Sequence, residues 1–264
     1  MDLKLQNKTA FISGSTAGIG FAIAERLARE GVRVIINGRT QKRVAFAIQS
    51  LHKAVPHAKI EGIPGDLGHK KGCAALVRQL RDVDILVNNL GIFEPKPFEE
   101  IPDEDWLRLF EVNVMSGVRL SRAYLAGMKK RNWGRIVFIS SESAVQIPAE
   151  MIHYGMTKTA QIAIARGLAE SCAGTGVTVN TVLAGPTASE GVTDFIATLA
   201  KEKDLTPAQF EQEFFKSMRP TSLVKRFLKP AEIAAVVAFV CSPEASAVTG
   251  AALRAEGGVV KAAL

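Results

Sequence analysis

Short apolar runs alternate along the chain with longer segments in which hydrophobic residues recur at helical spacing. Most of the runs are apolar almost throughout, which is typical of strands that helices cover on both faces. This alternation predicts an α/β fold, a doubly wound parallel sheet of about seven strands with helices on both faces. We expect strands at residues 9–13, 33–37, 59–63, 84–87, 135–139, 177–182 and 251–254, and long helices at about 103–131 and 151–173.

Composition favours one domain. At 264 residues and 47% hydrophobic content the chain can bury a substantial core, and no Pro/Ser/Gly-rich linker divides it, so we expect a single domain over residues 1–264. The N-terminus lacks the apolar run of a signal peptide, and no stretch offers about 18 uninterrupted apolar residues. We therefore expect a soluble, cytoplasmic protein without a membrane partner.

Cysteine, histidine and charge argue against several other classes of protein. The three cysteines are far apart and the four histidines show no ligand spacing, so neither a disulfide framework nor a metal site is expected. The net charge is +7, yet the 33 basic residues are interleaved with 26 acidic ones along the whole chain. We therefore expect no nucleic-acid partner and interpret the charge as an attraction for anionic ligands, including phosphorylated cofactors.

A glycine-rich turn follows the first expected strand. Residues 13–20 read SGSTAGIG and lead into an apolar helical pattern. Gly14, Gly18 and Gly20 would let the chain turn tightly and bring backbone N–H groups and a helix N-terminus close to a pyrophosphate. A strand-to-helix turn without a ligand remains the alternative, because the spacing differs from the Gly-x-Gly-x-x-Gly fingerprint.

Tyr154 and Lys158 lie one helical turn apart, and Ser141 ends an apolar strand thirteen residues before the tyrosine. A phenol, with a usual pKa of about 10, exchanges protons near neutrality only when its phenolate is stabilised. An ammonium at i+4 on the same helix face supplies part of that stabilisation, and Ser141 could hold the reacting oxygen. The three residues indicate proton transfer at a carbonyl, although a core tyrosine with a snorkelling lysine has the same spacing.

Two other polar positions stand out. Asn88-Asn89-Leu90-Gly91 follows the fourth expected strand and offers two amides and a close backbone approach, or a simple turn. Asn113 lies inside an otherwise apolar helix, where a buried amide needs partners and could support a water or a backbone bend.

Together these features resemble the short-chain dehydrogenase/reductase family over essentially the whole chain. The family's Thr-Gly-x-x-x-Gly-x-Gly is similar to residues 13–20, and its Asn-Asn-Ala-Gly is similar to residues 88–91. The resemblance implies a Rossmann-type domain and an enzyme that transfers hydride between nicotinamide and a carbonyl or secondary alcohol. The catalytic tetrad it implies is Asn113, Ser141, Tyr154 and Lys158.

The resemblance also implies a role for each member of the tetrad. Tyr154 exchanges the proton, and Ser141 orients the carbonyl or alcohol oxygen. Lys158 binds the nicotinamide ribose and lowers the tyrosine pKa, while Asn113 supports a water relay.

The cofactor preference depends on the end of the second expected strand. NAD-specific relatives carry an acid there, whereas this chain has Gly38 followed by Arg39, whose guanidinium could bind a 2′-phosphate. NADP(H) is therefore favoured and NAD(H) remains possible. The cofactor contacts that the resemblance implies are Gly14, Ser15, Thr16, Gly18, Ile19, Gly20, Arg39, Asp66, Leu67, Asn89, Gly91, Tyr154, Lys158 and Thr187.

The substrate is a small carbonyl or alcohol compound that the sequence does not specify. Residues 188–227 lie where the family places a substrate lid, and an apolar cover is suggested by Phe195, Phe210, Phe214, Phe215 and Met218. Further candidates for the pocket, or for core and subunit contacts, are Leu90, Phe93, Gln146, Ile147, Met151 and Met156. Glu142 and Ser143 directly follow Ser141 and are polar pocket candidates, or residues that only cap or solvate the loop. A 3-oxoacyl-carrier-protein reductase is one alternative, and a non-catalytic NADP(H)-binding sensor protein is another. The family also leads us to expect a homotetramer or homodimer.

Overall fold

The computed structural model describes residues 2–190 and 205–263. Its strands are β1 (Thr9–Ile12), β2 (Arg33–Gly38), β3 (Ile60–Pro64), β4 (Ile85–Asn88), β5 (Gly134–Ser141), β6 (Val177–Ala184) and β7 (Ala252–Ala255). They form one sheet in the order β3-β2-β1-β4-β5-β6-β7, and every neighbouring pair is parallel. Each strand lies within two residues of the run that predicts it, so the expected sheet is confirmed.

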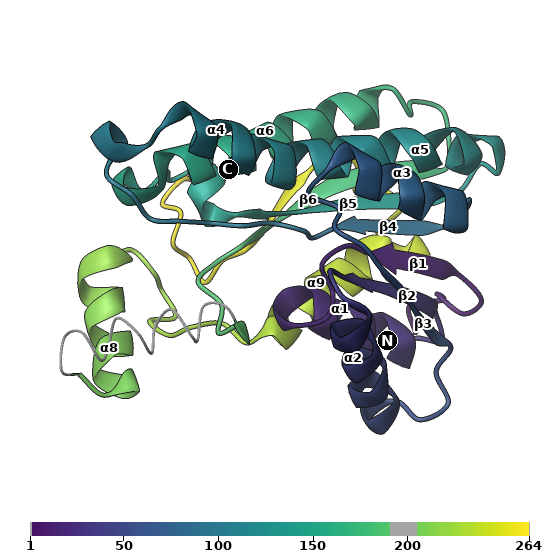
Figure 1. Ribbon diagram of the computed structural model, residues 1–264, viewed down its shortest axis with the longest axis horizontal. Coiled ribbons are helices and arrows are strands. Elements are labelled where there is room, and N and C mark those ends of the chain that lie inside the picture. The colour runs from purple at the N-terminus through teal and green to yellow at the C-terminus, as the bar shows by residue number, and fades with distance from the viewer. Residues whose placement is uncertain (1, 191–204, 264) are drawn as a thin grey trace.

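Helices cover both faces of this sheet (Figure 1). One face carries α1 (Gly18–Arg29), α2 (Gln41–Ala54) and α9 (Pro230–Cys241), and the other carries α3 (Lys70–Gln79), α4 (Asp103–Phe110), α5 (Ser116–Lys130) and α6 (Ile152–Glu170). Each face packs its own hydrophobic core, so β5 and β6 are buried along their whole length. None of the helices in the described ranges combines the length and apolar character needed to span a bilayer.

The strand order reverses between β1 and β4, since β2 and β3 lie on one side of β1 and the later strands on the other. In an open parallel sheet the loops that leave the carboxyl ends of the strands diverge at such a point and leave a crevice there. The polar residues that follow β1, β4 and β5 all lie at this edge, which is where the sequence predicts the site.

The long helix expected at about 103–131 contains an interruption. A π-helical turn, Glu111–Met115, joins α4 to α5 and contains Asn113. Such a turn inserts one extra residue into the helix and is frequent at functional sites. The sequence pattern predicts the helix but not this local widening, because the apolar periodicity continues through it.

The expected lid begins after β6. Its described part contains α8 (Pro207–Glu213), which stands apart from the sheet in Figure 1, and a second π-helical turn, Phe214–Met218. At its base Thr187 forms a parallel bridge with Leu228. Phe195, one of the apolar residues expected in the lid, lies outside the described residues, and the lid function stays a prediction.

Candidate active site

A cavity of about 820 Å³ opens at the carboxyl edge of the sheet. Residues that follow β1, β2, β4, β5 and β6 line it, together with residues of α6 and of the expected lid. This volume lies in the range of about 300–1,000 Å³ that is typical of small-molecule and cofactor sites. The polar residues that the sequence places after separate strands therefore share one cavity.

The glycine-rich turn forms one end of the cavity. Gly14 and Gly18 both have φ of +59°, a left-handed conformation that favours glycine. A Cβ at Gly20 would lie 2.5 Å from Nδ2 of Asn89 and 2.7 Å from the carbonyl oxygen of Gly14. Ala17 precedes α1 and supplies no side-chain cap, so the first N–H groups of the helix are available to an anion.

Side chains hold this turn against the loop after β4. The Ser13 hydroxyl accepts hydrogen bonds from the backbone N–H groups of Asn89 and Leu90, each at 3.0 Å. Nδ2 of Asn89 donates to the carbonyl oxygens of Ser13 and Gly14 at 3.0 and 2.9 Å. Ser13 therefore keeps a hydroxyl where the family motif has threonine.

Ser15 does not line the cavity, unlike the other predicted cofactor residues. It is fully buried, donates to the carbonyl oxygen of Ile12 at 2.7 Å and accepts from the N–H of Asn37 at 3.0 Å. Its hydroxyl joins β1 to β2, so the structure gives it a structural contact where we expected a cofactor contact. Sequence spacing alone could not distinguish Ser15 from Thr16, which does line the cavity.

The end of β2 is built without an acidic side chain. A Cβ at Gly38 would lie 2.4 Å from the Cγ2 atom of Thr16, so Thr16 fills the space where an acid would begin. Arg39 follows on the cavity wall, and Arg43 on α2 lines the same end. The Arg43 guanidinium lies 3.2 Å from the Glu190 carboxylate, which also lines the cavity. Arg43 was missed by the sequence reasoning, although it falls one helical turn after Arg39.

Tyr154, Ser141 and Lys158 line the same wall of the cavity. Ser141 is the last residue of β5, and Tyr154 and Lys158 lie on the first turns of α6, with the ammonium 5.5 Å from the centre of the phenol ring. A Cβ at Gly155 would lie 2.6 Å from Ile147 and 3.0 Å from the Ser143 carbonyl oxygen. This glycine therefore lets α6 approach the loop after β5, which brings the phenol to Ser141.

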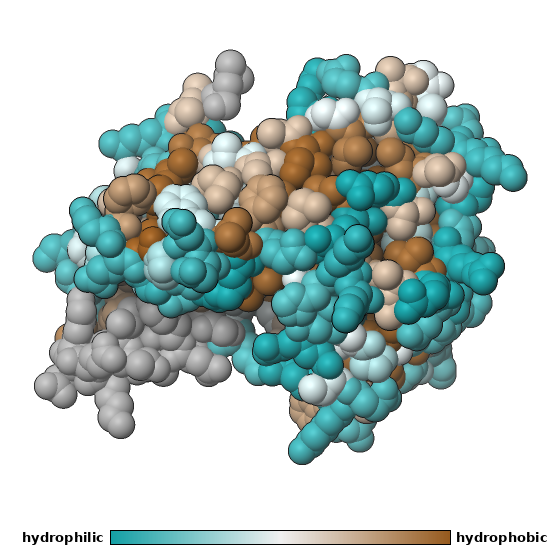
Figure 2. Space-filling view, turned by 45° about the horizontal axis from the view of Figure 1, so that its top comes forward, coloured by the Kyte–Doolittle hydropathy of each residue, from teal (hydrophilic) through white to brown (hydrophobic). Residues whose placement is uncertain are grey.

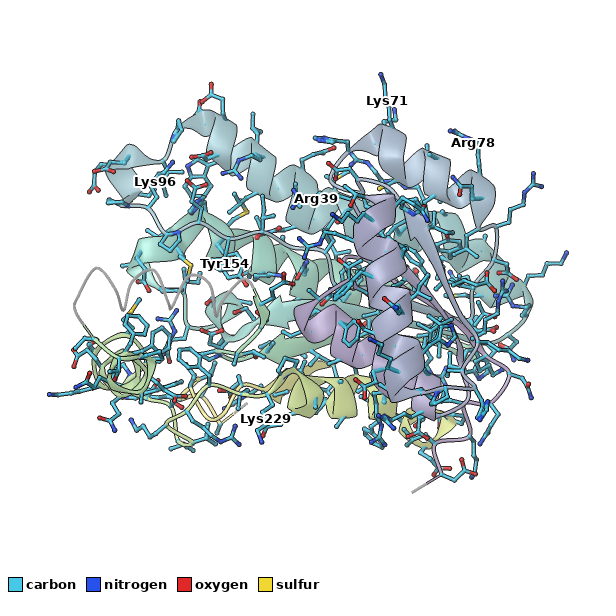
Figure 3. All side chains as sticks on the ribbon, turned by 60° about the horizontal axis from the view of Figure 1, so that its bottom comes forward. Arg39, Lys71, Arg78, Lys96, Tyr154 and Lys229 are labelled. Atoms are coloured by element: carbon cyan, nitrogen blue, oxygen red, sulfur yellow. The ribbon has the colours of Figure 1, made fainter. Side chains whose placement is uncertain are left out.

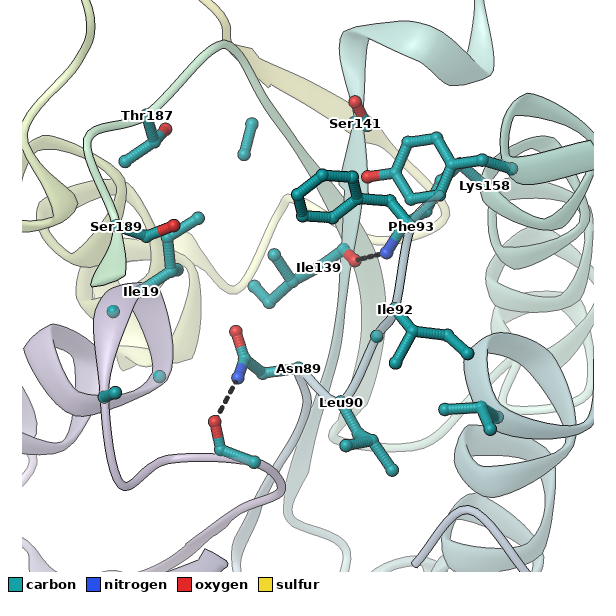
Figure 4. A pocket seen from close by; sticks show the side chains of 18 of the residues that line it. Ile19, Asn89, Leu90, Ile92, Phe93, Ile139, Ser141, Lys158, Thr187 and Ser189 are labelled. Atoms are coloured by element: carbon teal, nitrogen blue, oxygen red, sulfur yellow. Dashed lines mark hydrogen bonds between the residues drawn. The ribbon is translucent and has the colours of Figure 1, made fainter. Parts of the chain in front are cut away.

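Lys158 is only 4% exposed. Its ammonium donates to the carbonyl oxygen of Ile139 at 2.9 Å, the bond drawn in Figure 4, and to the side chain of Gln161 at 3.4 Å. A Cβ at Gly91 would lie 3.3 Å from Nζ, so this glycine leaves open space beside the ammonium. Burial lowers the pKa of Lys158 to about 8.

The phenol of Tyr154 lies in an environment that disfavours its charged form. Burial raises its pKa well above the usual range, and the Glu142 carboxylate adds to the rise. The hydroxyl of Ser141 and the charge of Arg219 act in the opposite direction. Without a ligand the phenol is therefore protonated at neutral pH, which is the form that can donate a proton.

Asn113 lies behind this wall and does not line the cavity. Its side chain accepts from the N–H of Ile92 at 2.8 Å and donates to the Ile92 carbonyl oxygen at 2.9 Å and to Thr157 at 3.0 Å. Its own carbonyl oxygen accepts from Gln161 at 2.7 Å. The π-helical turn thus fixes the loop after β4 to α6, and the water relay stays a prediction.

Known proteins resemble this chain over its full length. A family model described as Enoyl-(Acyl carrier protein) reductase matches residues 14–260. The uncharacterized oxidoreductase YvaG of Bacillus subtilis is 50% identical over 99% of both chains, and 3-oxoacyl-[acyl-carrier-protein] reductase FabG of Aquifex aeolicus is 34% identical over 98% of this chain and all of the relative. The crystal structure of L-sorbose reductase from Gluconobacter frateurii, complexed with NADPH and L-sorbose, has a TM-score of 0.93 at 30% identity and covers 99% of this chain and 100% of that one.

This chain belongs to the short-chain dehydrogenase/reductase family. The family resemblance expected from the motifs is thereby confirmed, and the protein is an oxidoreductase that acts on a CH–OH/C=O pair. Within the described ranges no three His, Cys, Asp or Glu side chains gather as metal ligands would.

In this short-chain dehydrogenase/reductase the substrate end of the cavity is only partly apolar. Of the residues expected there, Leu90, Phe93, Met151, Phe210, Phe214 and Met218 line it, whereas Gln146, Ile147, Met156 and Phe215 do not. Arg219 and Glu150 also line it and were missed by the sequence reasoning, which mentioned Glu142 only as a possible loop residue. The available signal was that Arg219 directly follows Met218 in the expected lid.

Proposed function

We propose that the protein is an NADP(H)-dependent oxidoreductase in which Tyr154 exchanges a proton with the oxygen of a ketone, aldehyde or secondary alcohol. The convergence of Ser141, Tyr154 and Lys158 on one wall of a glycine-lined cavity carries this proposal. Thr187, expected beside the nicotinamide carboxamide, lies on the opposite side of the opening in Figure 4.

The residues at the other end of the cavity fit a dinucleotide. The close approach at Gly20 and the uncapped start of α1 suit a pyrophosphate, and Leu67 and Asp66 line the part expected to hold adenine. Gly38 and Thr16 leave no room for the acid that would bind an unphosphorylated ribose. Arg39, with Arg43 nearby, would bind a 2′-phosphate through charge-assisted hydrogen bonds.

Each catalytic side chain has a role that follows from its position. The nicotinamide supplies or accepts the hydride when the cofactor is bound. In the reductive direction Tyr154 donates its proton to the carbonyl oxygen, and Ser141 hydrogen bonds to the same oxygen. Lys158 is mostly protonated at pH 7 because burial lowers its pKa only to about 8, so its charge stabilises the phenolate left behind. Asn113 holds the loop at Ile92 against α6 and so fixes this geometry.

Replacing each of the two tyrosines by phenylalanine tests the mechanism. We expect Tyr154→Phe to lower kcat by at least about a hundredfold, the minimum typical of a lost general acid, with NADPH binding retained. Tyr124→Phe is the matched control, because the Tyr124 hydroxyl is buried away from the cavity and donates to the Leu80 carbonyl oxygen at 2.9 Å. Equal turnover by the two variants would refute the assigned role of Tyr154.

Arginine variants test the cofactor preference. We expect Arg39→Ala to reduce the ratio of NADPH to NADH affinity by at least about tenfold, the effect of losing one charge-assisted contact of about 1.4 kcal/mol. Arg78→Ala is the control, since Arg78 projects from α3 away from the cavity in Figure 3, whereas Arg39 lies over it. An unchanged ratio in Arg39→Ala would show that the 2′-phosphate does not bind there.

The relatives suggest two kinds of substrate. L-sorbose reductase reduces a sugar, and FabG is named for a 3-oxoacyl group on a carrier protein. Reduction of a 3-oxoacyl thioester is the second candidate, favoured by the 34% identity to FabG and the basic net charge of +7. Comparing acetoacetyl thioesters with simple and hydroxylated ketones in one NADPH oxidation assay would decide between them.

Assembly and location are parts of the same proposal. Hydrophobic residues gather on the helical face turned forward in Figure 2. A mostly apolar groove runs between α5 and α6 and is lined by Val118, Leu125, Ala126, Ile164 and Leu168, with Arg122 and Lys129 beside them. Burial of this face between subunits supports a homodimer or homotetramer, which light scattering would measure. The three unpaired, buried cysteines suit a cytoplasmic location.

A further inference from the structure

A buried ion pair lies in the substrate end of the cavity, beside the catalytic residues. Glu142 directly follows Ser141, and Arg219 follows the second π-helical turn, Phe214–Met218. The two side chains are 4% and 7% exposed, and Nε of Arg219 lies 3.1 Å from Oε1 of Glu142. Both line the cavity together with Tyr154, so the pair belongs to the space that a substrate would enter.

The Glu142 carboxylate also holds the catalytic serine. Its Oε2 atom accepts a short hydrogen bond from the hydroxyl of Ser141, and its Oε1 atom accepts from Ser143 at 3.2 Å. A serine hydroxyl has one proton to donate. While Ser141 donates to Glu142, it therefore cannot donate to a substrate carbonyl oxygen.

The charges around the pair are not balanced. Arg219 also contacts Glu150, with Nη1 3.3 Å from its Oε1 atom, so two carboxylates share one guanidinium. Lys158 is not part of this group, because its ammonium donates to the Ile139 carbonyl oxygen and, among the described residues, forms no ion pair with Glu142 or Glu150. The cluster is thus net negative and disfavours an anionic substrate.

Such a cluster is costly in a pocket for a purely apolar ketone. Burying an ion costs several kcal/mol unless hydrogen bonds satisfy it, and the Glu142 carboxylate raises the pKa of Tyr154, which opposes phenolate formation. A hydroxyl group suits the cluster because it donates to a carboxylate and accepts from a guanidinium at once. A reacting oxygen that is hydrogen bonded to Ser141 would be joined to Oε2 of Glu142 by two hydrogen bonds in series, each about 2.7 Å long. A hydroxyl on the carbon next to the reacting carbon would then be within reach of Oε2.

We propose that the substrate is an uncharged hydroxy ketone, or the matching diol in the reverse direction, whose hydroxyl next to the reacting carbon binds Glu142 and Arg219. This inference rests on the proposed function. The substrate hydroxyl takes the place of Ser141 as the donor to Oε2, and the freed Ser141 proton turns to the carbonyl oxygen. With a ketone that lacks this hydroxyl, Ser141 stays bonded to Glu142. The preference for hydroxy ketones therefore affects kcat as well as KM. Phe93 and Phe214 supply the apolar part of the wall.

Two matched substrate pairs test this inference with saturating NADPH at pH 7. Hydroxyacetone and butanone have nearly the same shape, as do 2-hydroxycyclohexanone and 2-methylcyclohexanone, and pyruvate adds a charged analogue. We expect kcat/KM for each hydroxy ketone to exceed that of its partner, and that of pyruvate, by at least about tenfold, with part of the difference in kcat.

Variants then connect the preference to the ion pair. We expect Glu142→Gln to reduce the ratio of hydroxy ketone to ketone by at least about tenfold. Glu170→Gln is the control and should leave that ratio unchanged, because Glu170 forms an exposed ion pair with Arg166 on the surface of α6. If Glu142→Gln does not fold, judged by circular dichroism and NADPH binding, the double variant with Arg219→Gln removes the unpaired charge and keeps a polar side chain at both positions.

The outcomes separate the two proposals. Turnover of butanone or of an acetoacetyl thioester at least as efficient as that of the hydroxy ketones, or a ratio that survives loss of Glu142, would overturn the inference and leave the proposed function standing. Absence of turnover with every carbonyl tested, by protein that binds NADPH, would overturn the proposed function and this inference with it.

Discussion

Lys158 provides a test in which stability and activity change in opposite directions. Its ammonium is 4% exposed, and burial lowers its pKa from the usual 10.5 to about 8. In the Lys158→Met variant a side chain of similar length carries no charge. The variant removes the cost of burying an ammonium and also the charge that stabilises the phenolate.

The expected change in stability follows from the pKa of Lys158. Lowering it from 10.5 to about 8 means that the folded state bears a cost of roughly 3 kcal/mol at pH 7, where both states are protonated. Between pH 8 and 10.5 the unfolded chain binds the proton and the folded one does not, so wild-type stability rises with pH there. Loss of the bond to Ile139 costs about 1–2 kcal/mol at every pH. At pH 7 Lys158→Met should therefore be as stable as wild type or more stable by up to about 2 kcal/mol.

Urea unfolding at pH 7, 8, 9 and 10, without nucleotide, measures this difference. The advantage of Lys158→Met over wild type should shrink by roughly 2 kcal/mol from pH 7 to pH 10, while its kcat/KM at pH 7 falls at least about a hundredfold. Lys71→Met is the control, because Lys71 projects into solvent from α3 in Figure 3. A stability difference that stays constant across this pH range would refute the reasoning about the buried ammonium.

Other substitutions test the supporting contacts. Ser13→Ala leaves the backbone N–H of Leu90 without its acceptor and leaves that of Asn89 with the Val87 carbonyl oxygen alone, so it should cost about 1–3 kcal/mol of unfolding free energy in urea titrations. Asn113→Ala removes three side-chain hydrogen bonds and should lower the free energy of unfolding by about 2–4 kcal/mol, which a lower melting temperature would show. The same variant should also lower kcat. Gly38→Asp should weaken NADPH binding at least about tenfold more than NADH binding, with Gly38→Ala as the steric control. Burial raises the pKa of Cys241 to about 12, so dithionitrobenzoate should leave this thiol unmodified in native protein at pH 8 and label it in denaturant.

The sheet was predictable because its strands are buried on both faces. β5 contains the apolar run 136–139 and β6 is rich in valine, and the structure buries every residue of both strands. The runs located the strands well but not their ends, since polar residues such as Ser140 and Ser141 extend β5 beyond its apolar part. Backbone pairing with β6, which continues to Ala184, sets that boundary.

The convergence of Ser141, Tyr154 and Lys158 on one cavity was predictable because two of them share a helix face and the third ends a strand. The sequence did not predict the direction in which individual side chains point. Ser15 and Thr16 are adjacent and both carry hydroxyls, yet only Thr16 reaches the cavity, because Ser15 joins β1 to β2. Arg219 was missed for another reason. It is far from Tyr154 in sequence and comes to it only because the chain after β6 folds back over the cavity.

Two groups of buried charge now lie near the phenol of Tyr154, and they differ in origin and effect. Lys158 follows from the helix spacing, and we propose that its ammonium, 5.5 Å from the ring centre, favours the phenolate. The Glu142 carboxylate opposes the phenolate, and the Ser141 hydroxyl and Arg219 partly compensate. If proton transfer were the only demand on the site, replacing the ion pair by apolar residues would both stabilise the fold and assist the chemistry. Because the pair is held by Ser141, Ser143 and Glu150 in a single cluster, its presence is better explained by what the substrate must offer. In the proposed mechanism Tyr154 and Lys158 therefore determine the reaction, and the pair formed by Glu142 and Arg219 determines which substrate is accepted.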